Sequence, residues 1–270
     1  MLRTRVVTAV ALLVGLLIAL FVAPPVVGAG LLVLMVVQAT WEWGAFARLS
    51  GHPALRVGYL FVTAMLGVLT FERTRAPADF VALMIVAAVF WVVALARLAL
   101  HGETANRPAT LLAGWLALLP TGIALARIGS IAGARPGAVW FLLLLGMVSA
   151  ADIGAYFAGR RFGRLKLAPR ISPGKTWEGV IGGALLVFLV ALAAARALGV
   201  PQLALLGLSG VVFVASIVGD LTESLYKRSV GLKDSGSVLP GHGGLLDRID
   251  SLLAATPFYA LGLVWLGVLR

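Results

Sequence analysis

The sequence contains no cysteine and few charged residues. Only 12% of its 270 residues are Asp, Glu, Lys or Arg, and 61% are hydrophobic, whereas soluble domains average about 25% charged and roughly 45–50% apolar residues. The missing cysteines exclude a disulfide-stabilised scaffold. The scarcity of charge, together with a mean hydropathy of +1.03, excludes an ordinary soluble enzyme and a disordered chain. The composition therefore predicts an integral membrane protein.

Long uncharged segments predict how often the chain crosses the membrane. A bilayer core about 30 Å thick is crossed by ~20 apolar helical residues. The first run, 6–41, is divided by Pro24 and Pro25 into two helix-sized parts, because proline ends or interrupts a helix. Seven further runs follow, at 57–71, 80–96, 108–126, 136–151, 179–195, 197–219 and 251–269. We expect an all-α polytopic membrane protein with about nine transmembrane helices, or eight if the short run 57–71 does not cross.

The basic residues are distributed unevenly between the two sides of the predicted membrane. With nine spans, 16 of the 22 lysines and arginines lie on the side of the N-terminus and of the segments 159–178 and 220–250. Cytoplasmic loops carry an excess of such residues. We therefore expect an integral protein of the cytoplasmic (inner) membrane, with its N-terminus and these two segments in the cytoplasm. The net charge of +11 is then explained by the excess of lysine and arginine on the cytoplasmic side of the membrane. No nucleic-acid-binding module is recognisable in the sequence.

The acidic residues divide the chain differently. Only 11 are present, and seven of them lie between positions 152 and 250. This asymmetry predicts an N-terminal membrane region, 1–135, of about five helices. It also predicts a C-terminal catalytic region, 136–270, of about four helices with the cytoplasmic loops 159–178 and 220–250. We expect the polar chemistry to be confined to the C-terminal region.

Asp152 is the first polar residue of that region and lies near the end of an uncharged run. An ionisable group at such a depth is costly unless it faces a polar cavity or a partner. Asp152 can line a cavity, or it can pair with Arg160 or Arg161 at the helix end, and the sequence leaves both interpretations open.

Six basic residues follow between positions 160 and 175. Such a cluster either attracts anionic headgroups or binds phosphate. It is no P-loop, since the position of that motif's first glycine is occupied by Pro169. It does precede a helix expected near Glu178, whose free amides would favour an anion, so the candidate phosphate-binding residues are Ser172, Lys175 and Thr176. Glycines at 179, 182 and 183 suit close packing of that helix.

The strongest signal lies between the last two predicted helices, at 219–251. If the eighth helix continues past Gly219, the residues Asp220, Glu223, Ser224 and Lys227 share one face. Asp247, Asp250 and Ser251 do the same at the start of the last helix. Isolated acidic residues there would be caps or surface ion pairs. Two helix ends that present carboxylates to one another, however, offer the hard oxygen ligands that suit magnesium.

Basic and flexible residues accompany these carboxylates. Lys227, Arg228, Lys233 and His242 lie in the same glycine-rich stretch. The set resembles the requirements of phosphoryl or nucleotidyl transfer, where positioning and charge neutralisation supply most of the catalysis.

Residues 224–250, SLYKRSVGLKDSGSVLPGHGGLLDRID, resemble the signature of the phosphatidate cytidylyltransferases, also called CDP-diacylglycerol synthases. The upstream segment DIGAYFAGRRFGRLKLAPRISPGKTWEG and the early PP followed by WEW at 41–43 are similar to the same family. The resemblance therefore runs along the whole chain in matching order.

The resemblance implies transfer of CMP from CTP to phosphatidic acid, with CDP-diacylglycerol and pyrophosphate as products and Mg²⁺ as cofactor. Asp220 and Asp247 are then the expected metal ligands, with Glu223, Asp250 and Asp152, and a second cation, as alternatives. The groups expected to neutralise phosphate charge are Lys227, Arg228, Lys233 and Arg248. Those expected to orient substrate are Ser224, Asp234, His242 and the backbone of Gly243 and Gly244. The expected partners are CTP, phosphatidic acid and membrane lipid, and a homodimer is an expectation from the family alone.

Two other classes share some of these features. A secondary transporter or channel also has many helices, but it would place ionisable groups at mid-membrane and often shows an inverted repeat. Another membrane lipid-phosphate transferase, such as a CDP-alcohol phosphatidyltransferase, would carry that family's spaced aspartates, which are absent here.

Overall fold

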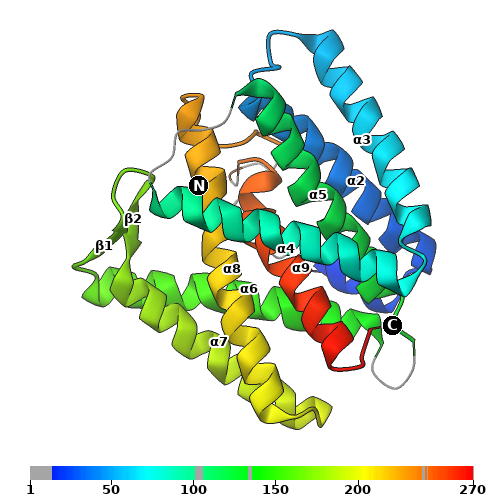
Figure 1. Cartoon of the computed structure of the whole chain (residues 1–270). Helices are drawn as coiled ribbons and strands as arrows, with labels where there is room; N and C mark the ends of the chain where they lie inside the picture. The colour runs from blue at the N-terminus through cyan, green and yellow to red at the C-terminus, as the bar shows by residue number, and fades with distance from the viewer. Residues whose placement is uncertain (1–13, 101–105, 133–135, 239–240, 242, 270) are drawn as a thin grey trace.

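The computed structural model describes residues 14–100, 106–132, 136–238, 241 and 243–269 (Figure 1). Within them the chain is almost entirely helical, so the predicted all-α fold is confirmed. A first helix occupies 14–21 in the described part. The other elements are α2 Pro25–Phe46, α3 Pro53–Arg73, α4 Pro77–Ala99, α5 Arg107–Gly129, α6 Gly137–Phe162, β1 Lys166–Ala168, β2 Ser172–Thr176, α7 Trp177–Leu198, α8 Gln202–Ser229 and α9 Leu246–Trp265.

Prolines set most of the helix starts. Helices α2 to α5 each have a proline at the first or second helical position, and Pro136 and Pro201 are the N-caps of α6 and α8. Proline suits these places because its fixed φ is already helical and its missing N–H would have no helical partner. The uncharged runs of the sequence are therefore separated into individual helices by local chemistry.

Seven of these helices, α2 to α8, are long and apolar enough to cross a membrane. The short run 57–71 lies within α3, which has 21 residues and so is about 31 Å long at ~1.5 Å per residue; it is long enough to cross. Helix α9 is outside this set, because it carries Asp247, Arg248 and Asp250 in its first turns.

Helix α9 forms the centre of the bundle and is surrounded by α4, α5, α6 and α8 (Figure 1). Leu253, Ala254, Ala255 and Ala260 on it are buried. Its neighbours also bond to it through polar groups: Thr121 Oγ1 donates to the Leu253 carbonyl at 3.1 Å, and Tyr259 Oη donates to the Trp140 carbonyl at 2.9 Å. These bonds fix the middle of α9 to α5 and α6, while α8 packs along it.

Helices α6 and α7 pack backbone against backbone. A Cβ built on Gly182 would overlap the Ala158 side chain and lie 2.8 Å from the Gly154 carbonyl oxygen, and one built on Gly183 would lie 2.8 Å from the Ala151 carbonyl oxygen. Small residues permit such close approach between membrane helices. The predicted packing role of these glycines is confirmed.

We expect Gly182→Val to destabilise the fold strongly. The two added methyl groups and the Cβ have no room between the helices, and overpacking of this kind costs about 1–3 kcal/mol, more where backbone must move. The matched control is Gly207→Val in α8, where a Cβ meets nothing within 4 Å. The unfolding midpoint of each variant is measured by titration with a denaturing detergent in mixed micelles. Equal midpoints for Gly182→Val and Gly207→Val would contradict the close packing of α6 and α7.

The segment 159–178 is more ordered than the predicted loop. Helix α6 continues to Phe162, and the rest forms an antiparallel hairpin in which Lys166 pairs with Thr176 and Ala168 with Ser172. The Glu178 carboxylate accepts from the Leu165 amide at 3.2 and 3.3 Å. Hydropathy does not reveal this hairpin, because its stability comes from contacts with the start of α7.

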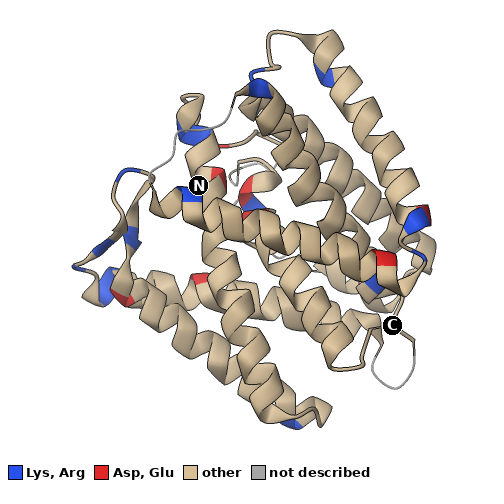
Figure 2. Ribbon diagram, viewed as in Figure 1, with Lys and Arg blue, Asp and Glu red and all other residues tan. Residues whose placement is uncertain are grey.

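Most basic residues collect at the end of the bundle that carries the hairpin (Figure 2). Arg48, Arg107 and Arg228 line one cavity there, whereas Arg127 bonds to the Thr74 carbonyl at the opposite end. The structure thus places the two long polar segments at the same end of the helices.

Candidate active site

The last turns of α8 carry the first part of the candidate site. Helix α8 continues to Ser229, so Asp220, Glu223, Ser224 and Lys227 share one face, as the sequence predicted. Ser224 Oγ donates to Asp220 Oδ1 at 3.4 Å, and Lys227 Nζ lies 3.2 Å from Glu223 Oε1. The Glu223 side chain is only 2% exposed. A buried carboxylate of this kind is stabilised by the lysine beside it.

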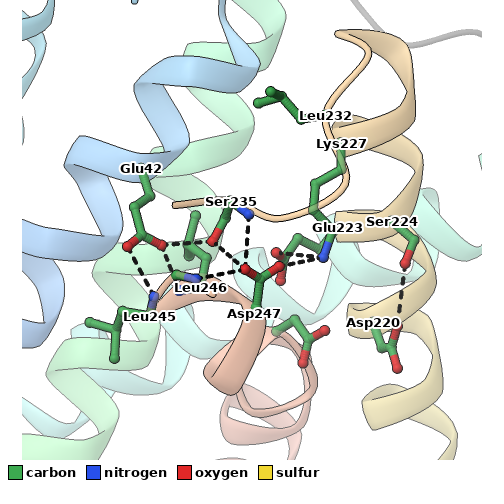
Figure 3. Close-up of polar contacts among 12 residues, drawn as sticks. Glu42, Asp220, Glu223, Ser224, Lys227, Leu232, Ser235, Leu245, Leu246 and Asp247 are labelled. Atoms are coloured by element: carbon green, nitrogen blue, oxygen red, sulfur yellow. Dashed lines mark hydrogen bonds and ion pairs between the residues drawn. The ribbon is translucent and has the colours of Figure 1, made fainter. Parts of the chain in front are cut away.

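Asp247, at the start of α9, joins α8 to the loop between the two helices (Figure 3). Its Oδ1 accepts from Lys227 Nζ at 2.6 Å. Its Oδ2 accepts from Ser235 N at 2.9 Å, Ser235 Oγ at 3.1 Å and Gly244 N at 2.9 Å. Both carboxylate oxygens are therefore engaged by protein groups, and the Asp247 side chain is only 7% exposed.

Glu42 of α2 completes this network, although the sequence analysis did not include it. Its Oε1 accepts from Gln38 Nε2 at 2.8 Å and Leu245 N at 2.9 Å. Its Oε2 accepts from Ser235 Oγ and Leu246 N, both at 2.8 Å. The expectation that polar chemistry is confined to the C-terminal region is wrong for this residue. The available signal was a lone acid directly after the predicted run 6–41, since ionisable residues so close to a span usually have a partner.

Gly244 is required by the same network. A Cβ on it would overlap Ser235 Oγ and lie 2.5 Å from Glu42 Oε2. Its amide, expected to orient substrate, here donates to Asp247. Gly243 has a positive φ of 83°, which glycine adopts at little cost. The two glycines thus let the loop pass close to both carboxylates.

We expect Glu42→Gln to lower turnover about tenfold or more, since the new amide nitrogen would face the backbone N–H of Leu245 or Leu246, and a buried donor left without an acceptor costs about 1–3 kcal/mol. As a positioning residue, Glu42 should act through the loop. Hydrogen exchange at the Leu245 and Leu246 amides should therefore rise in the variant.

Glu72→Gln is the control for this substitution, because the Glu72 side chain is 53% exposed and pairs with Arg75. Unchanged exchange at Leu245 and Leu246 in Glu42→Gln would show that Glu42 does not hold the loop.

A pocket of about 220 Å³ lies between α6, α7 and α8, beside the hairpin. Asp152, Lys175, Asp220 and Ser251 line it, together with Thr176. Lys175 Nζ lies 2.5 Å from Asp220 Oδ2. Of the two interpretations of Asp152, the structure favours the cavity, since Arg160 Nη1 donates to Tyr156 Oη at 2.8 Å instead.

Thr176 lines the pocket and is also the N-cap residue of α7. Its Oγ1 accepts from Gly179 N at 3.2 Å and so caps α7. Such a cap satisfies one of the free amides at the helix start. Ser172 begins β2 on the hairpin and is not among the residues that line the pocket.

The remaining predicted residues are not gathered into one place. Arg228 lies on the other side of α8, in a cavity with Arg48 and Arg107. Lys233, Asp234 and Arg248 are exposed. Asp250 Oδ1 accepts from the Ser251 amide at 2.6 Å. His242 lies outside the described residues.

The donor set fits a magnesium ion that takes part of its ligands from phosphate. In the described part of the chain, no three His, Asp or Glu residues are placed to hold a metal ion between them. Mg²⁺, however, is commonly held by one or two carboxylates plus substrate phosphates and water. Asp152 of α6 and Asp220 of α8, which both line the pocket, could supply such a pair.

Comparison with known proteins decides the family. The model of the cytidylyltransferase family matches residues 3–266. The chain belongs to the cytidylyltransferase family. A phosphatidate cytidylyltransferase of Pseudomonas aeruginosa is 42% identical, covering 98% of this chain and 97% of the relative. One of Haemophilus influenzae is 36% identical, covering 96% and 98%. One of Bacillus subtilis is 44% identical over 42% of each chain.

As a member of the cytidylyltransferase family, the chain is an enzyme, and its apolar helices make it a membrane protein. The match spans both the Glu42 side of the network and the 219–251 segment. The family match therefore includes the segments of this chain that build the pocket and the network described above.

Proposed function

We propose that the protein transfers CMP from CTP to phosphatidic acid, giving CDP-diacylglycerol and pyrophosphate. The observation that carries the proposal is the pocket of Asp152, Lys175 and Asp220 in a chain that is similar along its whole length to phosphatidate cytidylyltransferases. The pocket lies near the ends of membrane helices, where a lipid phosphate and a soluble nucleotide can meet.

In the proposed reaction an oxygen of the phosphatidate phosphate attacks the α-phosphorus of CTP. The new bond joins that oxygen to the α-phosphorus, the bond to the bridging α–β oxygen breaks, and pyrophosphate leaves with that oxygen. A phosphate monoester has its second pKa near about 6, so it is largely ionised at neutral pH. The nucleophile therefore needs no general base from the protein.

The protein's own part is to neutralise charge and to position the phosphates. Lys175 reaches the pocket from the hairpin, and Lys227 lies on the same face of α8 two turns from Asp220. Preorganised charges of this kind stabilise developing negative charge in phosphoryl transfer. The Asp247 and Glu42 contacts hold Lys227 and the loop in place before substrate arrives.

Asp220 and Asp152 would hold Mg²⁺, which when bound supplies positive charge to the triphosphate. Lys175 now neutralises Asp220 at 2.5 Å, and it would turn to the phosphates as the cation takes its place. Asp247 would join the metal only by giving up a contact with Lys227, Ser235 or Gly244.

We also propose the orientation in the inner membrane, with the hairpin and the 230–245 loop cytoplasmic. The excess of basic residues at that end supports it, as does the need for CTP. The chain has no cysteine, so single cysteines can be introduced for labelling in intact cells. Lys166→Cys on the hairpin should be protected from a membrane-impermeant maleimide, and Arg73→Cys at the other end should be labelled. The reverse pattern would overturn the orientation.

The reaction is tested by incubating the purified protein with radiolabelled CTP, phosphatidate and Mg²⁺ and resolving the lipid product. We expect one CDP-diacylglycerol formed per pyrophosphate released, and no product with chelator or with diacylglycerol in place of phosphatidate. Flux of CTP into liposomes without lipid product would instead favour the transporter alternative.

A further inference from the structure

A second cavity lies on the face of α8 opposite the carboxylates. It has a volume of about 720 Å³ and lies between the end of α2, the start of α5 and the end of α8. Three arginines line it, namely Arg48, Arg107 and Arg228. Within the described part of the chain, no carboxylate comes within salt-bridge distance of these guanidinium groups. Among the described residues, the hydrogen bonds of Arg48 and Arg228 are long contacts with the backbone carbonyls of Ser229 and Leu232, at 3.5 and 3.4 Å.

A mainly apolar groove, whose lining also includes Arg97 near the end of α4, continues from this cavity toward the middle of the membrane. It has a volume of about 200 Å³ and lies between α4, α5 and α8. Leu225 lines both the cavity and the groove. On α5 the cavity is lined by Arg107 and Thr110 and the groove by residues from Ala109 to Leu116, so the two overlap near the start of the helix and the groove runs deeper along it. The Leu112 side chain is 52% exposed at its edge.

The basic cavity and the mainly apolar groove are complementary to the anionic headgroup and the acyl chain of an acidic phospholipid. Arginine recognises phosphate through several fixed N–H donors, and a guanidinium group at a membrane surface attracts an anionic headgroup. An acyl chain in the groove would cover apolar side chains at the depth where lipid tails lie. A soluble phosphate would fill the cavity and leave the groove unused.

We propose that this cavity and groove bind an acidic phospholipid, with its phosphate among Arg48, Arg107 and Arg228 and one acyl chain between α4, α5 and α8. The site is separate from the reaction pocket. Thr222 and Leu225 face the groove, while Asp220 and Lys227 face away from it on the other side of α8. The bound lipid would contact α8 next to the loop that Asp247 and Glu42 hold.

The test uses phosphatidylglycerol, an acidic lipid that has a phosphodiester and so is no substrate for the proposed transfer. Native mass spectrometry of the full chain in detergent measures its retention against concentration, with phosphatidylcholine, which is zwitterionic and has no net charge, as the reference. The wild type should retain phosphatidylglycerol preferentially. In Arg48→Gln/Arg107→Gln the half-saturating concentration should rise about 30-fold, from the loss of two basic groups near an anionic headgroup. Arg48→Lys/Arg107→Lys should stay much closer to wild type.

Two further variants separate this site from general surface charge. Arg161→Gln/Arg164→Gln removes the same charge from the region next to the hairpin and should change retention by less than about threefold. Leu112→Trp fills the groove without changing charge and should weaken retention about tenfold.

Equal losses in the two arginine pairs would overturn the proposal in favour of diffuse attraction. Wild-type lipid retention in Leu112→Trp would show that the groove does not bind an acyl chain. Displacement of the lipid by millimolar inorganic phosphate or CTP would show that the arginines bind a soluble ligand instead. These outcomes are independent of whether CTP and phosphatidate are turned over.

Discussion

Turnover of CTP should fall about 1,000-fold in Asp247→Asn. The carboxylate is the junction of the site, since Lys227 contacts Oδ1 at 2.6 Å and three donors from Ser235 and Gly244 contact Oδ2. An asparagine that keeps its oxygen toward Ser235 and Gly244 presents its NH₂ to the lysine ammonium. Lys227 then loses its shorter ion pair and moves toward buried Glu223. Removal of one preorganised electrostatic group typically costs about 100- to 1,000-fold in rate.

The control for Asp247 is Asp79→Asn. Asp79 lies in the first turn of α4 at the other end of the bundle, with its side chain 42% exposed and its Oδ2 3.8 Å from Arg73. Turnover by the purified proteins, with thermal unfolding measured in parallel, separates loss of catalysis from loss of fold. Wild-type turnover in Asp247→Asn would remove Asp247 from the site.

Asp220→Asn should have the second-largest effect, a fall in turnover of about 100-fold with a changed dependence on magnesium. Asp220 lines the pocket, and its only ion pair among the described residues is that with Lys175. A ligand that loses its negative charge binds Mg²⁺ more weakly, so the half-saturating Mg²⁺ concentration should rise about tenfold or more.

The magnesium titration distinguishes a metal ligand from a residue that positions Lys175. Lys175→Met removes the same ion pair but no carboxylate, so it should lower turnover without raising the half-saturating Mg²⁺ concentration, which should stay the same or fall because the cation no longer has to displace the lysine from Asp220. If Asp220→Asn behaves like Lys175→Met, then Asp220 acts by holding the lysine and the metal ligands lie elsewhere.

Local patterns made the helices predictable. Uncharged runs and the prolines between them locate α2 to α8, because apolar surface and helix starts are properties of neighbouring residues in the chain. The ends of α6 and α8 lie about ten residues beyond the predicted runs, at Phe162 and Ser229, because both helices continue into charged sequence. The face shared by Asp220, Glu223 and Lys227 was likewise predictable, since it needs only a helix that continues past Gly219. The hairpin at 166–176 was not, because its strands are short and depend on Glu178 for support.

Glu42 shows where sequence reasoning stops. It lies 193 positions from Ser235 in the chain, yet the two side chains bond at 2.8 Å. No spacing rule connects them, since their distance depends on how α2 packs against α9. The same holds for Arg228, which neighbours Lys227 in the chain but faces the second cavity.

The amino-acid order alone was sufficient to determine a polytopic helical membrane protein, the approximate positions of its helices and the segments that carry most of its charged residues. The folded chain decided which charges meet. Asp247 became the partner of Lys227 and the loop, Asp220 the partner of Lys175, and the arginines beside α8 the lining of a separate cavity. The physical reason is that hydropathy and helix starts are short-range properties, whereas an ion pair or a cavity depends on the packing of helices that are distant in the chain.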